Sequence, residues 1–229
     1  MNDPLSTGGL PLRSLSPPDP LYAMYFRQLA GARRILDVGC GPGDLGRHRP
    51  SREVTVHGVD LDPDALARAA SAETVVRADL DGGPLPYADH SFDAVVAKDI
   101  FEHLVRPERL AREVWRVLRP GGTVVASVVM ARPRAVWADY THVRGFTRQT
   151  APKLLADAGF VVERVWRMGG VPFSRRLRFL RLVPWMLRLP GPNQLWAASW
   201  ELRARKVTDR GSGGLKERSG SPPVERVAG

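Results

Sequence analysis

The feature that most constrains the fold of this chain is a short apolar segment, residues 34–38, that leads directly into three closely spaced glycines. Gly39, Gly41 and Gly43 occupy alternate positions after a run that contains β-branched residues. Glycines remove side chains where the backbone bends sharply or where a ligand comes close. The run therefore predicts a strand, a tight turn and then a helix. It departs from the dinucleotide-binding fingerprint because Asp44 stands at the third glycine position, and a turn that binds nothing is the alternative.

Segments with the patterns of strands and helices alternate along the rest of the chain. Strands are expected at residues 34–38, 53–59, 74–77, 92–97, 123–129, 160–166 and 196–207. Helices are expected at residues 21–30, 44–49, 62–70, 107–118 and 149–158. Such alternation predicts an α/β fold, a doubly wound parallel sheet with helices on both faces. The helix at 44–49 is expected to be short or irregular, because Gly46 and Pro50 disfavour a longer one.

The length of 229 residues fits one domain. We expect this domain at residues 21–207, after an irregular arm at 1–20 and before a disordered tail at 208–229. The one cysteine, Cys40, permits no internal disulfide, excludes a zinc site built from cysteines and fits a reducing cytoplasm. No apolar run of about 18 residues predicts a transmembrane helix, and no secretory signal is recognised. A cytoplasmic location is therefore expected.

The net charge of +10 is concentrated in one part of the chain. Residues 1–163 hold 20 basic and 20 acidic residues, whereas residues 164–206 hold ten basic residues and one acid. Within that second part, residues 170–192 interleave arginines with large apolar residues and form a basic amphipathic insertion between the sixth and seventh expected strands. Three interpretations are open: a lid over a hydrophobic acceptor, a segment that rests on anionic lipid, or a nucleic-acid patch. The neutral remainder of the chain disfavours nucleic acid.

Acidic residues stand at the ends of four successive expected strands. They are Asp37, Asp60, Asp79 and, after Lys98, Asp99. In an open α/β sheet, ligands bind outside the carboxyl ends of the strands. Asp60 lies about 20 residues beyond the first glycines, the spacing at which an acid receives ribose hydroxyls. These acids therefore predict a ligand site at this edge of the sheet.

At this point the chain resembles the class I S-adenosylmethionine-dependent methyltransferases, of the broad small-molecule type. The resemblance covers roughly residues 30–167. Its motifs, in chain order, are LDVGCGPG at 36–43, GVDLDP at 58–63, ADL at 78–80, SFDAVV at 91–96, EHL at 102–104, EVWRVLRPGG at 113–122 and DAGF at 157–160. The resemblance implies a Rossmann-like sheet of seven mostly parallel strands with an antiparallel last strand, and S-adenosyl-L-methionine as cofactor.

The resemblance also implies roles for residues of the glycine turn. The turn, which consists of Gly39, Cys40, Gly41 and Gly43 with their neighbours, passes under the methionine part of the cofactor. Asp37 lies near the amino group of that part. Because this cofactor contains no phosphate, the third glycine of the dinucleotide fingerprint is not needed.

Further along the chain, the resemblance implies contacts to the nucleoside. Asp60 takes both ribose hydroxyls, a role that suits the two oxygens of a carboxylate. Leu61 packs on the adenine, and Asp79 accepts a hydrogen bond from the adenine amino group with Leu80 beside it. Lys98, at the end of the fourth strand, borders the methyl donor.

The expected reaction is methyl transfer to a small organic acceptor, first of all at oxygen. A hydroxyl nucleophile needs a base, and His103 and His142 follow the fourth and fifth strands, although either can be structural. No metal site is identified. A hydrophobic or lipid-like acceptor and peripheral membrane contact are compatible with residues 170–192. The rival hypotheses are a non-catalytic module that binds the cofactor or a partner, and an RNA methyltransferase that uses the basic segment.

Overall fold

The computed structural model describes residues 19–168 and 197–207. The insertion predicted at 170–192 and the tail predicted at 208–229 lie outside these residues, as does nearly all of the predicted arm. The helices of the described parts are α1 (Pro20–Gln28), α2 (Asp44–Arg47), α3 (Pro63–Ala69), the 3₁₀ helix η1 (Phe101–His103), α4 (Pro107–Val117), α5 (Pro133–Val136) and α6 (Thr150–Asp157). The strands are β1 (Arg34–Val38), β2 (Thr55–Asp60), β3 (Thr74–Arg77), β4 (Phe92–Lys98), β5 (Leu118–Val129), β6 (Phe160–Met168) and β7 (Ser199–Lys206).

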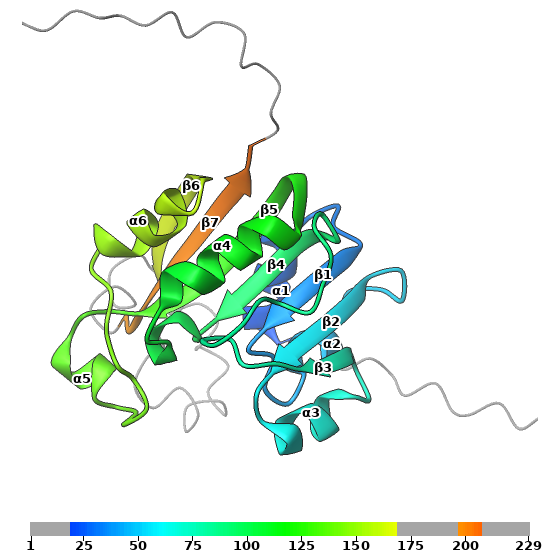
Figure 1. Ribbon diagram of the computed structural model, residues 1–229, viewed down its shortest axis with the longest axis horizontal. Helices are drawn as coiled ribbons and strands as arrows, with labels where there is room; N and C mark the ends of the chain where they lie inside the picture. The colour runs from blue at the N-terminus through cyan, green and yellow to red at the C-terminus, as the bar shows by residue number, and fades with distance from the viewer. Residues whose placement is uncertain (1–18, 169–196, 208–229) are drawn as a thin grey trace, which may run out of the picture.

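The seven strands form one sheet in the order β3-β2-β1-β4-β5-β7-β6 (Figure 1). Strands β1 to β5 pair in parallel, whereas β7 is antiparallel to both β5 and β6. The chain first builds outward from β1 through β2 to β3 and then returns to place β4 on the other side of β1. The predicted doubly wound, mostly parallel sheet with an antiparallel last strand is confirmed. Its topological switch point lies between β1 and β4, where ligands bind in such sheets.

Helices cover both faces of the sheet, and the alternation of side chains along each strand assigns residues to a face. Ile35 of β1 packs with Tyr25 of α1 and Leu45 of α2 on one face. Leu36 packs on the opposite face, in the larger core that contains α4 and α6. Figure 1 shows α4 in front of the sheet and α1 behind it. Because side chains alternate, Asp37 shares the face of Ile35 and points toward α1.

The predicted elements are present, with differences at their ends. The α2 helix has only four residues, as its glycine and proline predicted. The β5 strand begins at Leu118, five residues before the predicted start at 123, but its pairing with β4 shifts register between Leu118 and Thr123, where Gly121 has a φ angle of 80°. The predicted turn at Pro120-Gly121-Gly122 is therefore present as an irregularity within the strand. The short elements η1 and α5 are not predicted by the sequence patterns. Both lie at the carboxyl edge of the sheet, where they matter for the site.

None of the helices in residues 19–168 and 197–207 is both long and apolar enough to cross a lipid bilayer.

Candidate functional site

The predicted glycine turn directly follows β1. Gly39, Gly41 and Gly43 have φ angles of 72°, 51° and 81°, a region that side-chain-bearing residues rarely adopt. A Cβ atom on Gly43 would meet Cα of Ala69 in α3 at 2.7 Å, so this glycine allows α3 to pack against the turn. A Cβ atom on Gly41 would meet nothing within 4 Å. The turn is therefore packed on its α3 side and open at Gly41, where a ligand can lie against the backbone.

Asp60, at the end of β2, holds the turn in place. Its Oδ2 atom accepts a hydrogen bond of 2.9 Å from the Gly41 backbone N–H, and its Oδ1 atom accepts one of 3.0 Å from the Asp62 N–H. A carboxylate offers about four acceptor positions, so both oxygens keep capacity for ribose hydroxyls. Asp62 in turn caps α3 by accepting from the Asp64 N–H at 2.9 Å. The acid predicted to bind the ligand thus also orders the loop around it.

A cavity of about 160 Å³ opens between the glycine turn, α1 and the end of β4. Two tyrosines of α1 line this cavity together with Asp37 and Lys98. Its residues are Tyr22, Tyr25, Asp37, Gly39, Cys40, Gly41, Pro42, Asp44, Leu45, Val96 and Lys98. The structure therefore brings together most of the residues predicted for the methionine part of the cofactor.

Asp37 is the most unusual group in this cavity. Its side chain is only 5% exposed, and no group in the described residues donates a hydrogen bond to its carboxylate. Burial, followed by the nearby Glu73 carboxylate, raises the pKa of Asp37 well above its usual range, while Lys98 acts in the opposite direction. A buried carboxylate without a hydrogen-bond donor is costly. It suits a cationic ligand group, such as the ammonium of S-adenosylmethionine, which would supply both charge and hydrogen bonds.

A row of polar side chains continues the site across the neighbouring strands. Lys98 of β4, Ser127 of β5 and Glu201 of β7 are register partners on the face toward α1. Glu201 is buried and accepts a hydrogen bond of 3.0 Å from the Tyr25 hydroxyl. Burial raises the pKa of Glu201. Burial opposes the charge of Lys98, but the ion pair with Asp99 raises its pKa overall.

Asp99 directly follows β4 and has a φ angle of 52°, in the left-handed region. Its side chain pairs with Lys98, and its Oδ1 atom accepts a hydrogen bond of 2.6 Å from the Ser127 hydroxyl. A non-glycine residue in this conformation costs free energy and is typically found at functional sites. The strain marks the end of β4 as a part of the site that its surroundings hold in place.

The residues predicted for the adenine lie at the ends of β2 and β3. Leu61 is 53% exposed, an apolar side chain available for stacking. Asp79 is exposed, and its Oδ1 atom accepts a hydrogen bond of 3.0 Å from the Asp81 N–H, which leaves the other oxygen available. Leu80 is buried in the main core and supports this loop from inside. Cys40 packs against Leu66 and Ala69 of α3, and burial raises the pKa of its thiol.

The two predicted histidines lie side by side, although 38 residues stand between them in the sequence. The rings of His103 and His142 lie 4.7 Å apart between centroids. Nδ1 of His142 lies 2.8 Å from the Val136 carbonyl, and Nδ1 of His103 lies 2.9 Å from the Thr141 hydroxyl. That hydroxyl donates to Asp139 Oδ1 at 2.6 Å. The arrangement leaves the Nε2 atoms as the basic nitrogens.

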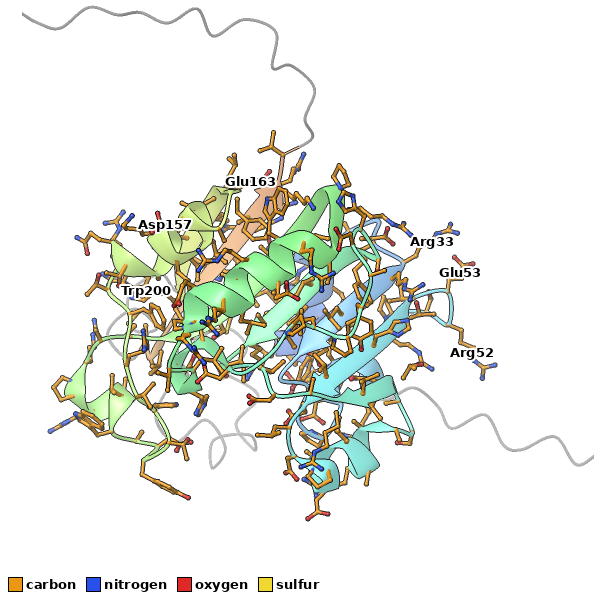
Figure 2. All side chains as sticks on the ribbon, viewed as in Figure 1. Arg33, Arg52, Glu53, Asp157, Glu163 and Trp200 are labelled. Carbon is orange, nitrogen blue, oxygen red and sulfur yellow. The ribbon has the colours of Figure 1, made fainter. Side chains whose placement is uncertain are left out.

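A second, larger cavity of about 300 Å³ lies at the opposite edge of the sheet, near Asp93, Arg119 and Gly121. Asp93 accepts hydrogen bonds from the Arg33 and Arg34 N–H groups at 3.1 and 2.8 Å and pairs with Arg119. These contacts make Asp93 structural. Figure 2 shows Arg33 at this end of the sheet, far from α5. We place the candidate site at the smaller cavity, because the glycine turn, Asp37 and Lys98 line it.

Several residues of the site are not identified by the sequence reasoning. They are Tyr22, Tyr25, Ser127, Asp139, Thr141 and Glu201. Only Asp139 and Thr141 have a local sequence signal, because an acid two residues before a threonine can accept a hydrogen bond from the threonine backbone. In the structure, Oδ1 of Asp139 accepts from the Thr141 N–H at 2.9 Å. The others come together through the strand order, which brings α1 and β7 to the ends of β4 and β5.

An α/β sheet of this order, with an open glycine turn after β1 and an acid after β2, is a Rossmann-like fold. Residues 36–126 match the family described as a methyltransferase domain. The protein resembles an uncharacterized methyltransferase of Mycobacterium avium (strain 104), with 38% identity over 114 residues, 48% of this chain and 44% of the relative. The segment 36–126 therefore belongs to the methyltransferase domain family, as its motifs predicted, and the chain matches less than half of that relative's length.

Solved structures show the same fold. One, titled as an S-adenosylmethionine-dependent methyltransferase from Mesorhizobium loti, has a TM-score of 0.58 and 24% identity, with 81% of this chain and 96% of that chain covered. Another, titled as the [4+2]-cyclase SpnF, has a TM-score of 0.62 and 22% identity, with 82% of this chain and 80% of that chain covered. At these identities the likeness concerns the fold alone.

Proposed function

We propose that this domain binds S-adenosyl-L-methionine and transfers its methyl group to a small organic acceptor, at oxygen. The observation that carries the proposal is the buried Asp37 carboxylate, which faces the cavity beside the open glycine turn and receives no hydrogen bond from the described residues. A carboxylate in that position is matched by a ligand with an ammonium group. Membership of the methyltransferase domain family over residues 36–126 supports the same ligand.

Each part of the cofactor has a candidate partner. Asp37 would accept hydrogen bonds from the ammonium, and the free acceptor positions of Asp60 would take the ribose hydroxyls. Leu61 would stack on the adenine, and the available oxygen of Asp79 would accept from its amino group. When bound, the cofactor supplies an activated methyl group on a sulfonium. The order of these residues along the strand ends matches the order of the chemical groups in the ligand.

The chain's own contribution to transfer would be alignment, exclusion of water and removal of a proton. Methyl transfer is a displacement in which a carbon–sulfur bond breaks as a carbon–oxygen bond forms, so positioning supplies much of the rate. Tyr22 and Tyr25 line the cavity and would exclude water around the bound cofactor. Nε2 of His103 or of His142 would take the proton that the acceptor hydroxyl loses. Both nitrogens are basic in the tautomers that their hydrogen bonds favour.

A second candidate is a domain of this fold with a different activity. The similarity in fold to a protein titled as a [4+2]-cyclase supports this second candidate. Such a domain would bind the cofactor or a partner without transferring a methyl group. The nucleic-acid alternative depends on the basic segment 170–192, which lies outside the described residues.

Two experiments test these proposals. The first is calorimetry with S-adenosylmethionine and with its demethylated product. The second is a transfer assay with methyl-labelled cofactor and a panel of hydroxyl, amine and thiol acceptors. We expect saturable binding and label transfer to a hydroxyl acceptor. Binding without transfer to any acceptor would favour the second candidate. Absence of binding, with Asp60→Ala indistinguishable from the parent, would contradict both.

A further inference from the structure

Three potential metal ligands converge at the carboxyl edge of the sheet. His103 belongs to η1, directly after β4, and Asp139 and His142 belong to the loop after α5. One side-chain ligand atom from each lies within 4.8 Å of the other two. Figure 1 shows α5 on the side of the sheet toward which the arrows of β1 and β4 point. The cluster is therefore separate from the glycine turn but lies at the same edge of the sheet.

Hydrogen bonds fix both histidines in the form that binds metals. The Val136 carbonyl only accepts, so the Nδ1 atom of His142 at 2.8 Å carries the hydrogen. The Thr141 hydroxyl donates its hydrogen to Asp139 at 2.6 Å, so it accepts from Nδ1 of His103 at 2.9 Å. Each Nε2 atom consequently presents a lone pair. Metal-binding histidines nearly always donate their other ring N–H to a carbonyl or to a similar outer partner.

Two hydrogen bonds orient the carboxylate of Asp139. Its Oδ1 atom accepts from both the hydroxyl and the backbone N–H of Thr141, at 2.6 and 2.9 Å. The Oδ2 atom accepts no hydrogen bond from the described residues. Thr141 therefore orients a histidine and a carboxylate at the same time and leaves one unused ligand atom on each.

We propose that His103, Asp139 and His142 form a binding site for a divalent transition-metal ion, with zinc as the best-matched representative. Two imidazole nitrogens and one carboxylate suit such ions, whereas Mg²⁺ and Ca²⁺ prefer oxygen ligands throughout. With bonds of about 2.0–2.2 Å, ligand atoms of a tetrahedral site lie roughly 3.3 Å apart. The ligand atoms, within 4.8 Å of one another in the structure, would have to move closer on binding, and the exposed loop position of Asp139 leaves its side chain room to do so. Three protein ligands leave at least one coordination position open.

The open position gives the site a role in the reaction, and this part of the inference rests on the proposed function. A bound ion lowers the pKa of an oxygen ligand. It would then replace His103 and His142 as the group that activates the acceptor hydroxyl, because their Nε2 atoms would hold the ion. Metal binding itself rests only on the geometry of the cluster and is measured without any methyl transfer.

The test is calorimetric titration of Zn²⁺ into the full chain, purified without a histidine tag and treated with a chelator. We expect one saturable ion per chain. Replacing a ligand, as in His142→Ala or Asp139→Asn, should weaken binding by more than the roughly 10- to 100-fold typical of losing an outer partner. Thr141→Val, which removes only such a partner, should fall within that range. Visible absorption of bound Co²⁺ gives an independent readout of nitrogen coordination and should change in His142→Ala and in the matching variant His103→Ala.

His90→Asn is the matched control. His90 lies outside the cluster with a φ angle of 58°, a conformation that asparagine tolerates. This variant should bind Zn²⁺ like the parent. Circular dichroism of every variant separates loss of the fold from loss of the site. Equal zinc affinity in the parent and in a folded His103→Asn/His142→Asn double variant would overturn the proposal, and so would the absence of a saturable site. If zinc binds but no acceptor is methylated, the metal site stands and the proposed function fails.

Discussion

Oδ2 of Asp60 accepts a hydrogen bond of 2.9 Å from the backbone N–H of Gly41, across 19 residues of sequence. The contact joins the end of β2 to the open point of the glycine turn. The carboxylate therefore fixes Gly41, which lines the cavity, and under the proposed function its remaining acceptor positions take the ribose hydroxyls. A substitution at Asp60 should change both.

Asp60→Ala should weaken S-adenosylmethionine binding by about 10- to 150-fold, since hydrogen bonds to a charged group contribute roughly 1.5–3 kcal/mol. It should also lower the free energy of unfolding, because the Gly41 N–H loses its partner. Calorimetry and urea unfolding measure the two effects. Asp157→Ala, which removes an exposed carboxylate paired with Lys153, is the control and should change neither by a comparable amount. Unchanged affinity in Asp60→Ala would remove Asp60 from the binding site.

Gly41 and Gly43 offer a paired comparison, since both have positive φ angles but different surroundings. Gly43→Ala should lower the free energy of unfolding by about 2–5 kcal/mol, because the left-handed conformation and the overlap with Ala69 both contribute. Gly41→Ala should cost only the conformational part, about 1–2 kcal/mol. Its larger effect should be on cofactor affinity, because the added methyl group enters the open space beside the turn. Urea unfolding measures which variant loses more stability, and calorimetry measures which loses more cofactor affinity. Equal losses of stability in the two variants would contradict the packing argument.

The proposed cofactor side of the site follows from the sequence because its residues are set by local rules. A strand, a turn and a following acid recur in a fixed spacing, so Asp37 and Asp60 were predictable without knowing how distant strands pair. The tight packing of Gly43 on Ala69 of α3 is consistent with this, since α3 follows the second strand of the same β-α-β unit.

The acceptor side depends on contacts between distant parts of the chain. Tyr25 reaches Glu201 across 176 residues, and His103 meets Thr141 across 38. No periodicity or spacing encodes these pairs, because they arise from the insertion of β7 between β5 and β6 and from the loop around α5. The sequence identified both histidines but not the Asp139 carboxylate that lies close to them.

Glu73 makes the stability of the domain depend on pH. Its side chain is buried and accepts a hydrogen bond of 2.9 Å from the Gly46 N–H. Burial raises its pKa from 4.5 to about 6. The folded state therefore binds more protons than the unfolded state between these values, so the free energy of unfolding falls as pH rises through this window, by about 2 kcal/mol. The charged and titratable groups that face Glu73 are Asp37, Cys40, Asp44 and Arg47.

Glu73→Gln should flatten this part of the pH profile, since glutamine keeps an oxygen for the Gly46 N–H and carries no charge. Urea unfolding at several pH values between about 4.5 and 7 measures the slope for the parent and the variant. Some slope should persist, because burial raises the pKa of Asp37 in the same direction. A variant with the full slope of the parent would show that Glu73 does not titrate in this window.

Asp37 should couple cofactor binding to the release of a proton. Burial and Glu73 raise its pKa in the free protein, whereas a cationic ligand beside it favours the ionised form. Affinity for S-adenosylmethionine should therefore increase with pH, by at most about tenfold per pH unit for one proton, until the pKa of free Asp37 is passed. Calorimetry in two buffers with different ionisation enthalpies measures the protons released. Asp37→Asn should bind S-adenosylmethionine more weakly and release fewer protons on binding. Proton release by Glu73→Gln shows how many of the released protons come from the neighbouring Glu73 carboxyl. Equal proton release by the parent and Asp37→Asn would place the ammonium of the cofactor elsewhere.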